Sequence, residues 1–261
     1  MNVNRTGLAI ALTIAAVVGV AFGVYPQLDL DVSALFFDAN KRTFEMGGQA
    51  WTLYSRDVAS ALITLLVAPA FVAIVSKLTL PRRRMLIGGR AALLLIVTLA
   101  LGPGVLANKI FKEHWGRMRP VDVTQFGGTD RFTPWWDPRG PCTENCSFIA
   151  GEPSGAFWTL APAALAPPQW RLLAYGAALA FGAFLGGVRI AAGGHFFTDV
   201  MFAGVFMFWL AWVVHGLMYR WRPTRLTDKA IEQPLEWAGG AVRDALAALV
   251  RRVAGRKSPR A

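Results

Sequence analysis

A histidine and a carboxylate lie four residues apart in the segment RIAAGGHFFTD, between two long apolar stretches. His195 carries an imidazole that could attack a phosphorus atom, and Asp199 falls on the same face if the segment is helical. A carboxylate in that place can hold the ring in one tautomer and stabilise its cation. Arg189 adds a planar guanidinium that matches phosphate oxygens. Taken alone, the His–Asp pair also fits a simple hydrogen bond at the start of a helix.

Two other polar segments supply groups that suit the same kind of ligand. KEHWGRMRP contains Lys112 and Arg119, which with Arg189 make three cations suited to a phosphate dianion. GEPSGA begins a predicted helix, where free backbone N–H groups and the positive end of the dipole favour an anion. Pro153 and Gly155 suit a tight helix entry at which the backbone approaches a ligand.

Long apolar runs must position these segments. The chain has 261 residues, of which 54% are hydrophobic and 16% charged, whereas a soluble domain carries about 25% charged residues. Six apolar blocks predict an all-α, polytopic membrane protein with about six transmembrane helices. The first block is expected to be a retained helix rather than a signal peptide. The blocks lie at residues 7–25, 58–76, 85–107, 155–167, 172–188 and 196–214.

The net charge of +11 fits the positive-inside rule. Ten of the 27 Lys and Arg lie after residue 219. With six spans and the N-terminus inside, these charges are cytoplasmic, and no nucleic-acid partner is expected. We expect a transmembrane domain over residues 1–219 and a basic cytoplasmic tail over 220–261. The tail either forms an amphipathic helix on the membrane, which Gly239 and Gly240 disfavour, or is simply solvated.

The same count of spans brings the three polar segments to one face of the membrane, although they lie far apart in the sequence. Polar groups at membrane depth are costly and usually functional. The chain is therefore expected in a bacterial-type inner (plasma) membrane, with its site facing the periplasm or cell exterior. An alternative is that Arg117 and Arg119 are cations that only reach toward the lipid headgroups.

The outer loops are expected to differ in importance. Cys142 and Cys146 lie outside the cytoplasm in this topology, where disulfides persist, so a short disulfide is favoured over two free thiols. The loop 121–147 is either a functional lid or an inert cover. Residues 26–50 are expected to offer no chemistry.

Two other kinds of site find little support. The chain has only three histidines, which are His114, His195 and His215, and the last falls on the opposite side of the membrane. No metal and no cofactor are therefore expected. A serine-hydrolase site is disfavoured because GEPSG lacks the spacing of the G-x-S-x-G nucleophile elbow.

The first and third segments resemble the signatures of the type 2 phosphatidic acid phosphatases. KEHWGRMRP matches K-x6-R-P in full, and VRIAAGGHFFTD matches S-R-x5-H-x3-D except that Val188 replaces the serine. The resemblance covers roughly residues 85–215, and the six-helix layout agrees with it.

The second signature of that family, P-S-G-H, is altered. In one register Pro153, Ser154 and Gly155 match, and Ala156 replaces the histidine. In the other register SFIAGEPS aligns with S-F-P-S-G-H-A-S, which places Glu152 on the histidine. The second register is favoured because Glu152 can carry a proton. For Glu152 to act as an acid, burial at the membrane edge must raise the pKa of its carboxyl.

The resemblance implies a role for each matched residue. His195 would be the nucleophile that forms a phosphohistidine, Asp199 would orient it, and Glu152 would be the candidate general acid. The groups expected to bind phosphate are Lys112, Arg119, Arg189, Ser154 and Gly155.

The function that follows is an integral-membrane, metal-independent lipid phosphatase, with a phospholipid or glycolipid substrate drawn from the bilayer. Lipid A 1-phosphate, undecaprenyl diphosphate, phosphatidylglycerophosphate and phosphatidic acid are all compatible with it. Without a general acid, a substrate with a good leaving group would be favoured. The alternatives are a phosphotransferase that uses a lipid diphosphate, and a non-catalytic lipid-phosphate binder or transporter.

Overall fold

The computed structural model describes residues 4–255. The chain divides into two compact units, one made of residues 1–66 and 97–215 and the other of residues 67–96 and 216–261. The sequence-based domain boundary after residue 219 falls near the last of these breaks. The structure also groups residues 67–96 with the C-terminal segment. Residues 256–261 of the predicted tail lie outside the described residues.

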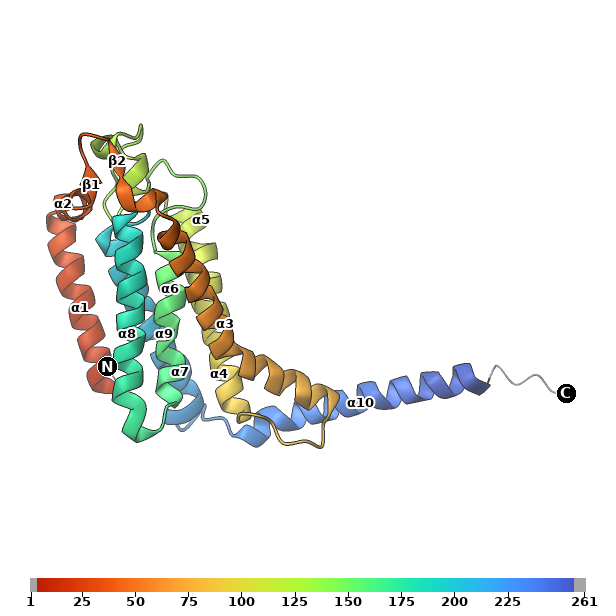
Figure 1. The fold of residues 1–261 in the computed structure, drawn as a ribbon. Helices are drawn as coiled ribbons and strands as arrows, with labels where there is room; N and C mark the ends of the chain where they lie inside the picture. Colours follow the sequence, from red (N-terminus) through yellow and green to blue (C-terminus); the bar gives the residue numbers. More distant parts are fainter. Residues whose placement is uncertain (1–3, 256–261) are drawn as a thin grey trace. The chain divides into compact units, whose positions relative to one another are not determined.

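The described chain is mostly helical, with one short two-stranded sheet, which agrees with the predicted all-α class (Figure 1). Within residues 4–255, five helices are long and apolar enough to cross a membrane. The third runs from Gly89 to His114 and is made of α4 (Gly89–Leu99), a π-helical segment η2 (Ala100–Phe111) and α5 (Lys112–His114). The others are α1 (Arg5–Val24), α3 (Ala50–Thr79), α8 (Pro168–Ala191) and α9 (Phe197–His215), which continues through η5 (Gly216–Arg220).

The predicted fourth span is shorter than a bilayer crossing requires. It consists of α6 (Gly151–Trp158) and α7 (Leu160–Leu165), and Thr159 separates them. Both helices are buried inside the first unit, where Trp158 donates a hydrogen bond from Nε1 to Thr98 Oγ1 at 2.9 Å. A helix covered by protein on all sides needs to match the packing of its neighbours rather than the thickness of the lipid.

The segments that follow α1, α5 and α8 lie at one end of the first unit, away from the start of α1, and are called the outer segments below (Figure 1). A small aromatic core holds them together, formed by Leu30, Phe44, Val123, Phe126 and Phe196. Cys142 and Cys146 form the expected disulfide. The short elements here are α2 (Gln27–Ala34), β1 (Phe37–Asp38), β2 (Thr43–Phe44), η1 (Glu45–Gly48), η3 (Pro120–Asp122) and η4 (Thr124–Phe126), with β1 and β2 antiparallel.

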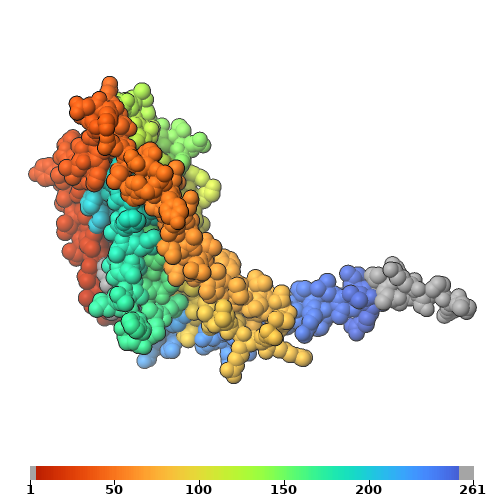
Figure 2. All heavy atoms as spheres, in the orientation of Figure 1, coloured from red at the N-terminus to blue at the C-terminus, as the bar shows by residue number. Residues whose placement is uncertain are grey.

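The second unit contains the helix predicted in the tail. α10 (Asp228–Gly255) continues through both glycines that disfavoured it. Its Asp228 accepts a hydrogen bond from the backbone N–H of Arg90 at 2.9 Å, and its Glu232 accepts one from Gly89 at 3.2 Å, so α10 caps the start of α4. Beyond these contacts, apolar side chains of α10 such as Leu246 and Leu249 are exposed, and this part of the helix is seen in Figure 2.

Candidate active site

A buried arginine joins the outer segments to the start of α9. Arg117 is fully buried, and its two terminal nitrogens donate hydrogen bonds to Asp199 Oδ1 at 2.5 Å and to Asp29 Oδ2 at 2.7 Å. Its Nε donates to the backbone oxygen of Thr133 at 3.0 Å, and its guanidinium lies 4.4 Å from the ring centre of Phe196. The alternative that Arg117 reaches toward lipid headgroups is therefore wrong.

Asp29 shows that the first outer loop does contribute to the site, contrary to expectation. Its carboxylate accepts hydrogen bonds from the backbone N–H of Thr198 at 3.0 Å and from the hydroxyl of Thr198 at 2.7 Å. It thereby caps the start of α9, which carries Asp199. Burial raises the pKa of Asp29 above its ordinary value, against the opposing effect of Arg117.

The hydrogen bonds of His195 determine which ring nitrogen is reactive. Its Nδ1 lies 2.8 Å from the backbone oxygen of Ser147. A carbonyl oxygen can only accept, so Nδ1 carries the proton and Nε2 keeps its lone pair. Nε2 is buried and has no hydrogen-bond partner among the described residues. The ring therefore presents an unprotonated nitrogen of the kind that a nucleophile needs.

Asp199 supports this arrangement through Ser147 rather than by a direct hydrogen bond to the ring. Its Oδ2 accepts hydrogen bonds from the Ser147 hydroxyl at 2.6 Å and from the backbone N–H of Phe196 at 2.8 Å. The same oxygen lies 3.8 Å from His195 Nδ1. Burial lowers the pKa of His195 below its ordinary value, although Asp199 opposes this effect. The imidazole is consequently neutral at pH 7.

Two of the three predicted cations, Arg189 and Lys112, lie near Glu152 together with Arg56. Arg189 Nε lies 3.3 Å from Glu152 Oε2, and Arg56 Nη2 lies 2.6 Å from Oε1. Two glycines leave room for the cations: a Cβ at Gly194 would lie 2.4 Å from Arg189 Nη2, and one at Gly151 would lie 2.8 Å from the ammonium nitrogen of Lys112. The segment RIAAGGHFFTD, the segment GEPSGA and α3 thus meet at the carboxylate of Glu152.

The environment of Glu152 shifts its acidity in the direction opposite to the one expected for a general acid. Burial acts to raise the pKa of the carboxyl, but the positive charges of Arg189, Arg56 and Lys112 outweigh it. The pKa of Glu152 is therefore below its ordinary value, so the raised pKa that a general acid would need is not found with these side chains alone. Glu152 is a carboxylate at pH 7 when only these side chains surround it.

The geometry of α6 distinguishes the two registers of the altered signature. Glu152 faces the cations, whereas Ala156 is buried with Ala59 and Leu185. The Ser154 hydroxyl donates to the backbone oxygen of Ala150 at 2.7 Å and is buried, so the structure does not bring it to the cations. Gly155 lies a full turn inside α6 and meets the neighbouring cavity with its backbone.

Comparison with known proteins identifies the family of this site. A family model described as the PAP2 superfamily matches residues 91–226. The chain belongs to the PAP2 superfamily. The resemblance to the type 2 phosphatidic acid phosphatases is thereby confirmed.

Curated relatives of this PAP2 protein agree on one kind of activity. A protein of Francisella tularensis subsp. novicida named Lipid A 4'-phosphatase is 33% identical over 223 residues, which cover 83% of this chain and 97% of that protein. Proteins of the same name from Rhizobium leguminosarum and Rhizobium etli are 35% and 36% identical, and the matches cover 40% and 39% of this chain and 45% and 40% of theirs. No solved structure matches the chain. This PAP2 protein is a multi-pass membrane phosphatase that acts on a lipid.

The PAP2 site includes residues that no motif indicated. Asn145 accepts a hydrogen bond from the Lys112 ammonium at Oδ1, at 3.3 Å, and one from Arg119 at its backbone oxygen, at 2.9 Å. Asn145 has a φ of 49°, a conformation that asparagine adopts more readily than most residues. Arg56 lies just before the predicted span 58–76, near the start of α3, and outside every family signature. Only the position of Arg56 near the outer end of its span could have suggested it.

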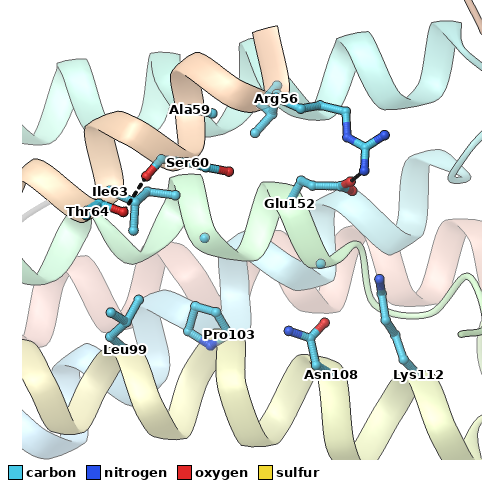
Figure 3. A pocket seen from close by; sticks show the side chains of 13 residues that line it. Arg56, Ala59, Ser60, Ile63, Thr64, Leu99, Pro103, Asn108, Lys112 and Glu152 are labelled. Atoms are coloured by element: carbon cyan, nitrogen blue, oxygen red, sulfur yellow. Dashed lines mark hydrogen bonds and ion pairs between the residues drawn. The ribbon is translucent and has the colours of Figure 1, made fainter. Parts of the chain in front are cut away.

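A cavity of about 430 Å³ opens beside these cations, between α3, η2 and α6 (Figure 3). Arg56, Glu152, Lys112 and Asn108 lie at its polar end, and Figure 3 shows Arg56 reaching toward the Glu152 carboxylate. The rest of the lining is mostly apolar and includes Ile63, Leu99, Pro103 and Leu185. Such a lining suits the acyl part of a lipid. Among the described residues, no group of three or more His, Cys, Asp or Glu side chains could hold a metal ion.

Proposed function

We propose that this PAP2 protein removes the 4'-phosphate of a lipid A-type glycolipid, through a phosphohistidine on His195, at the outer face of the membrane. The observation that supports the chemistry most directly is the buried Nε2 of His195, which has no partner among the described residues. The substrate is inferred from the names of the relatives. A 4'-phosphate has an ordinary sugar hydroxyl as its leaving group, so a proton donor is needed.

In the first half-reaction the phosphate dianion binds to Lys112, Arg119 and Arg189. Backbone N–H groups at the start of α6 add donors from the other side. Nε2 of His195 attacks phosphorus while the bond from phosphorus to the sugar oxygen breaks. Cations aimed at the phosphoryl oxygens stabilise the charge that develops during transfer. The proton on Nδ1 stays hydrogen-bonded to Ser147, which stabilises the positive ring that forms.

Glu152 supplies the proton to the leaving sugar oxygen. Before substrate binds, the cations keep Glu152 ionised. The arriving dianion takes over the pairing with Arg189, and its negative charge beside the carboxylate favours protonation of Glu152. Glu152 then donates this proton to the departing oxygen. In the second half-reaction the carboxylate accepts a proton from a water molecule, which attacks the phosphohistidine and releases inorganic phosphate.

The decisive experiment follows phosphate on purified protein in detergent. Lipid A carrying a radiolabelled 4'-phosphate should release inorganic phosphate, and rapid quenching in alkali should trap label on the protein. His195→Ala should abolish both signals. His114→Gln serves as the control, since this histidine is exposed and outside the proposed reaction. Phosphate release by His195→Ala at the normal rate would overturn the proposed mechanism.

A further inference from the structure

The disulfide loop Cys142–Cys146 separates two polar hollows at the outer end of the first unit. One has a volume of about 670 Å³ and the other about 570 Å³. Thr143, Glu144 and Asn145 line both of them. The first hollow also contains Lys112 and the second contains Arg119, so each one reaches a cation of the proposed phosphate site.

The loop is fixed firmly to the segment that carries these cations. The backbone N–H of Cys142 donates to Gly116 at 3.0 Å, and that of Cys146 donates to Lys112 at 2.9 Å. The disulfide closes the loop between these two bonds, and Asn145 contacts both cations from its centre. A phosphate held by Lys112 and Arg119 would therefore lie next to this loop, together with the group that carries the phosphate.

The side chains that line the two hollows indicate which class of chemical group next to the phosphate would bind there. Apart from the two cations, the polar lining is dominated by hydrogen-bond acceptors, which are Glu144, Glu113, Asp122 and Asp130 together with amide and hydroxyl groups. These carboxylates repel a second phosphate but accept hydrogen bonds from hydroxyl and amide N–H groups. Each hollow has the volume of a typical small-ligand site.

We infer that the loop Cys142–Cys146 is a recognition site for a neutral, hydroxyl-bearing sugar headgroup next to the phosphate. This inference rests on the proposed function and deepens it. A lipid whose headgroup is only a phosphate fills the cation site and leaves both hollows to water. A glycolipid phosphate also places sugar hydroxyls against Thr143 and Glu144, and these contacts give it an advantage.

The test compares two lipids in the same mixed micelles. The kcat/KM of phosphate release is measured for a lipid A-type 4'-phosphate and for phosphatidic acid, with wild type, Thr143→Ala and Glu144→Ala. Each variant should lower kcat/KM for the glycolipid by about 3- to 10-fold, as expected for one hydrogen bond, and leave that for phosphatidic acid unchanged. Asp137→Ala is the matched control, because Asp137 lies in the same outer loop but outside both hollows and pairs with Arg139.

The possible outcomes test the headgroup site and the proposed phosphatase function separately. An active wild type whose preference between the two lipids is unchanged in Thr143→Ala and Glu144→Ala overturns the headgroup site alone. An equal loss on both lipids also overturns it, because the loop then acts only as support for the cations. A wild type that releases phosphate from neither lipid overturns the proposed function, and the headgroup site falls with it.

Discussion

Glu152 stands where the family's second signature carries a histidine, and its carboxylate bridges Arg56 and Arg189. A histidine would be neutral or cationic among these arginines, whereas a carboxylate neutralises part of their charge. The substitution therefore changes the electrostatics of the site, and the proposed proton donor keeps the position that the histidine has in the family signature. Sequence alone could name the candidate but could not show which charges surround it, since Arg56 comes from a distant helix.

Replacing Glu152 by Gln should separate catalysis from binding. The variant keeps the shape of the side chain but cannot supply a proton, so kcat for the glycolipid should fall by about 10²- to 10⁴-fold. KM should stay level or fall, because the cations lose a competing carboxylate. Glu152→His should recover part of kcat. A Glu152→Gln enzyme with normal kcat would show that the leaving oxygen takes its proton from elsewhere.

Arg117 should matter for stability as much as for activity. Arg117→Met leaves Asp29 and Asp199 buried without their common partner, and breaking a buried ion pair costs about 3–5 kcal/mol. We expect a clear fall in the melting temperature of the purified protein in detergent. Arg139→Met is the control, since Arg139 is exposed and pairs only with its neighbour Asp137 among the described residues. A melting temperature equal to that of the control contradicts the central role given to Arg117.

At the scale of elements, hydropathy predicted the long helices well because lipid exposure leaves a continuous apolar signal. It placed the spans near residues 7–25, 58–76 and 196–214, and the structure has helices at each. The α6 and α7 pair is harder to recognise because it is short and Thr159 divides it. The three-dimensional arrangement of the outer segments could not be predicted from the sequence, because it depends on contacts between distant residues such as Asp29 and Arg117.

The cap that α10 places on α4 gives a prediction at this scale. Asp228→Ala removes the acceptor for the Arg90 N–H and the partner of its side chain, which should cost about 1 kcal/mol. Hydrogen exchange at the amide of Arg90 should become faster, and that of Gly89 less so because Glu232 still accepts its hydrogen bond. Asp244→Ala, farther along the same helix and exposed, should leave their exchange unchanged. Equal exchange rates in the two variants would mean that the cap does not hold the start of α4.

For the whole molecule, the number of chain crossings decides which segments lie on the same side of the membrane. The count of spans correctly predicted that the three polar segments lie together, as the contacts of Glu152, Arg117 and His195 show. It relied on counting α6 and α7 as one passage through the bundle, although they are too short to be recognised by length. The side of the membrane itself depends on the distribution of charge, which is a property of insertion rather than of packing.

That orientation can be tested with the two native cysteines. Intact cells of a bacterium expressing the protein, with the outer membrane permeabilised, are treated with a membrane-impermeant reductant and then a membrane-impermeant maleimide. Cys142 and Cys146 should be labelled, because the disulfide loop is expected outside the inner membrane. A Cys142→Ser, Cys146→Ser variant gives the background. Labelling that requires lysis of the inner membrane would reverse the proposed topology.

The hydrogen bond from His195 Nδ1 to Ser147 has a stereochemical consequence. Histidine can carry phosphorus on either ring nitrogen, which gives two isomers with different chemical stability. With one nitrogen committed to a main-chain oxygen, only the tele isomer can arise in this pocket. Antibodies that discriminate between the two isomers would therefore recognise a trapped adduct with one reagent and miss it with the other.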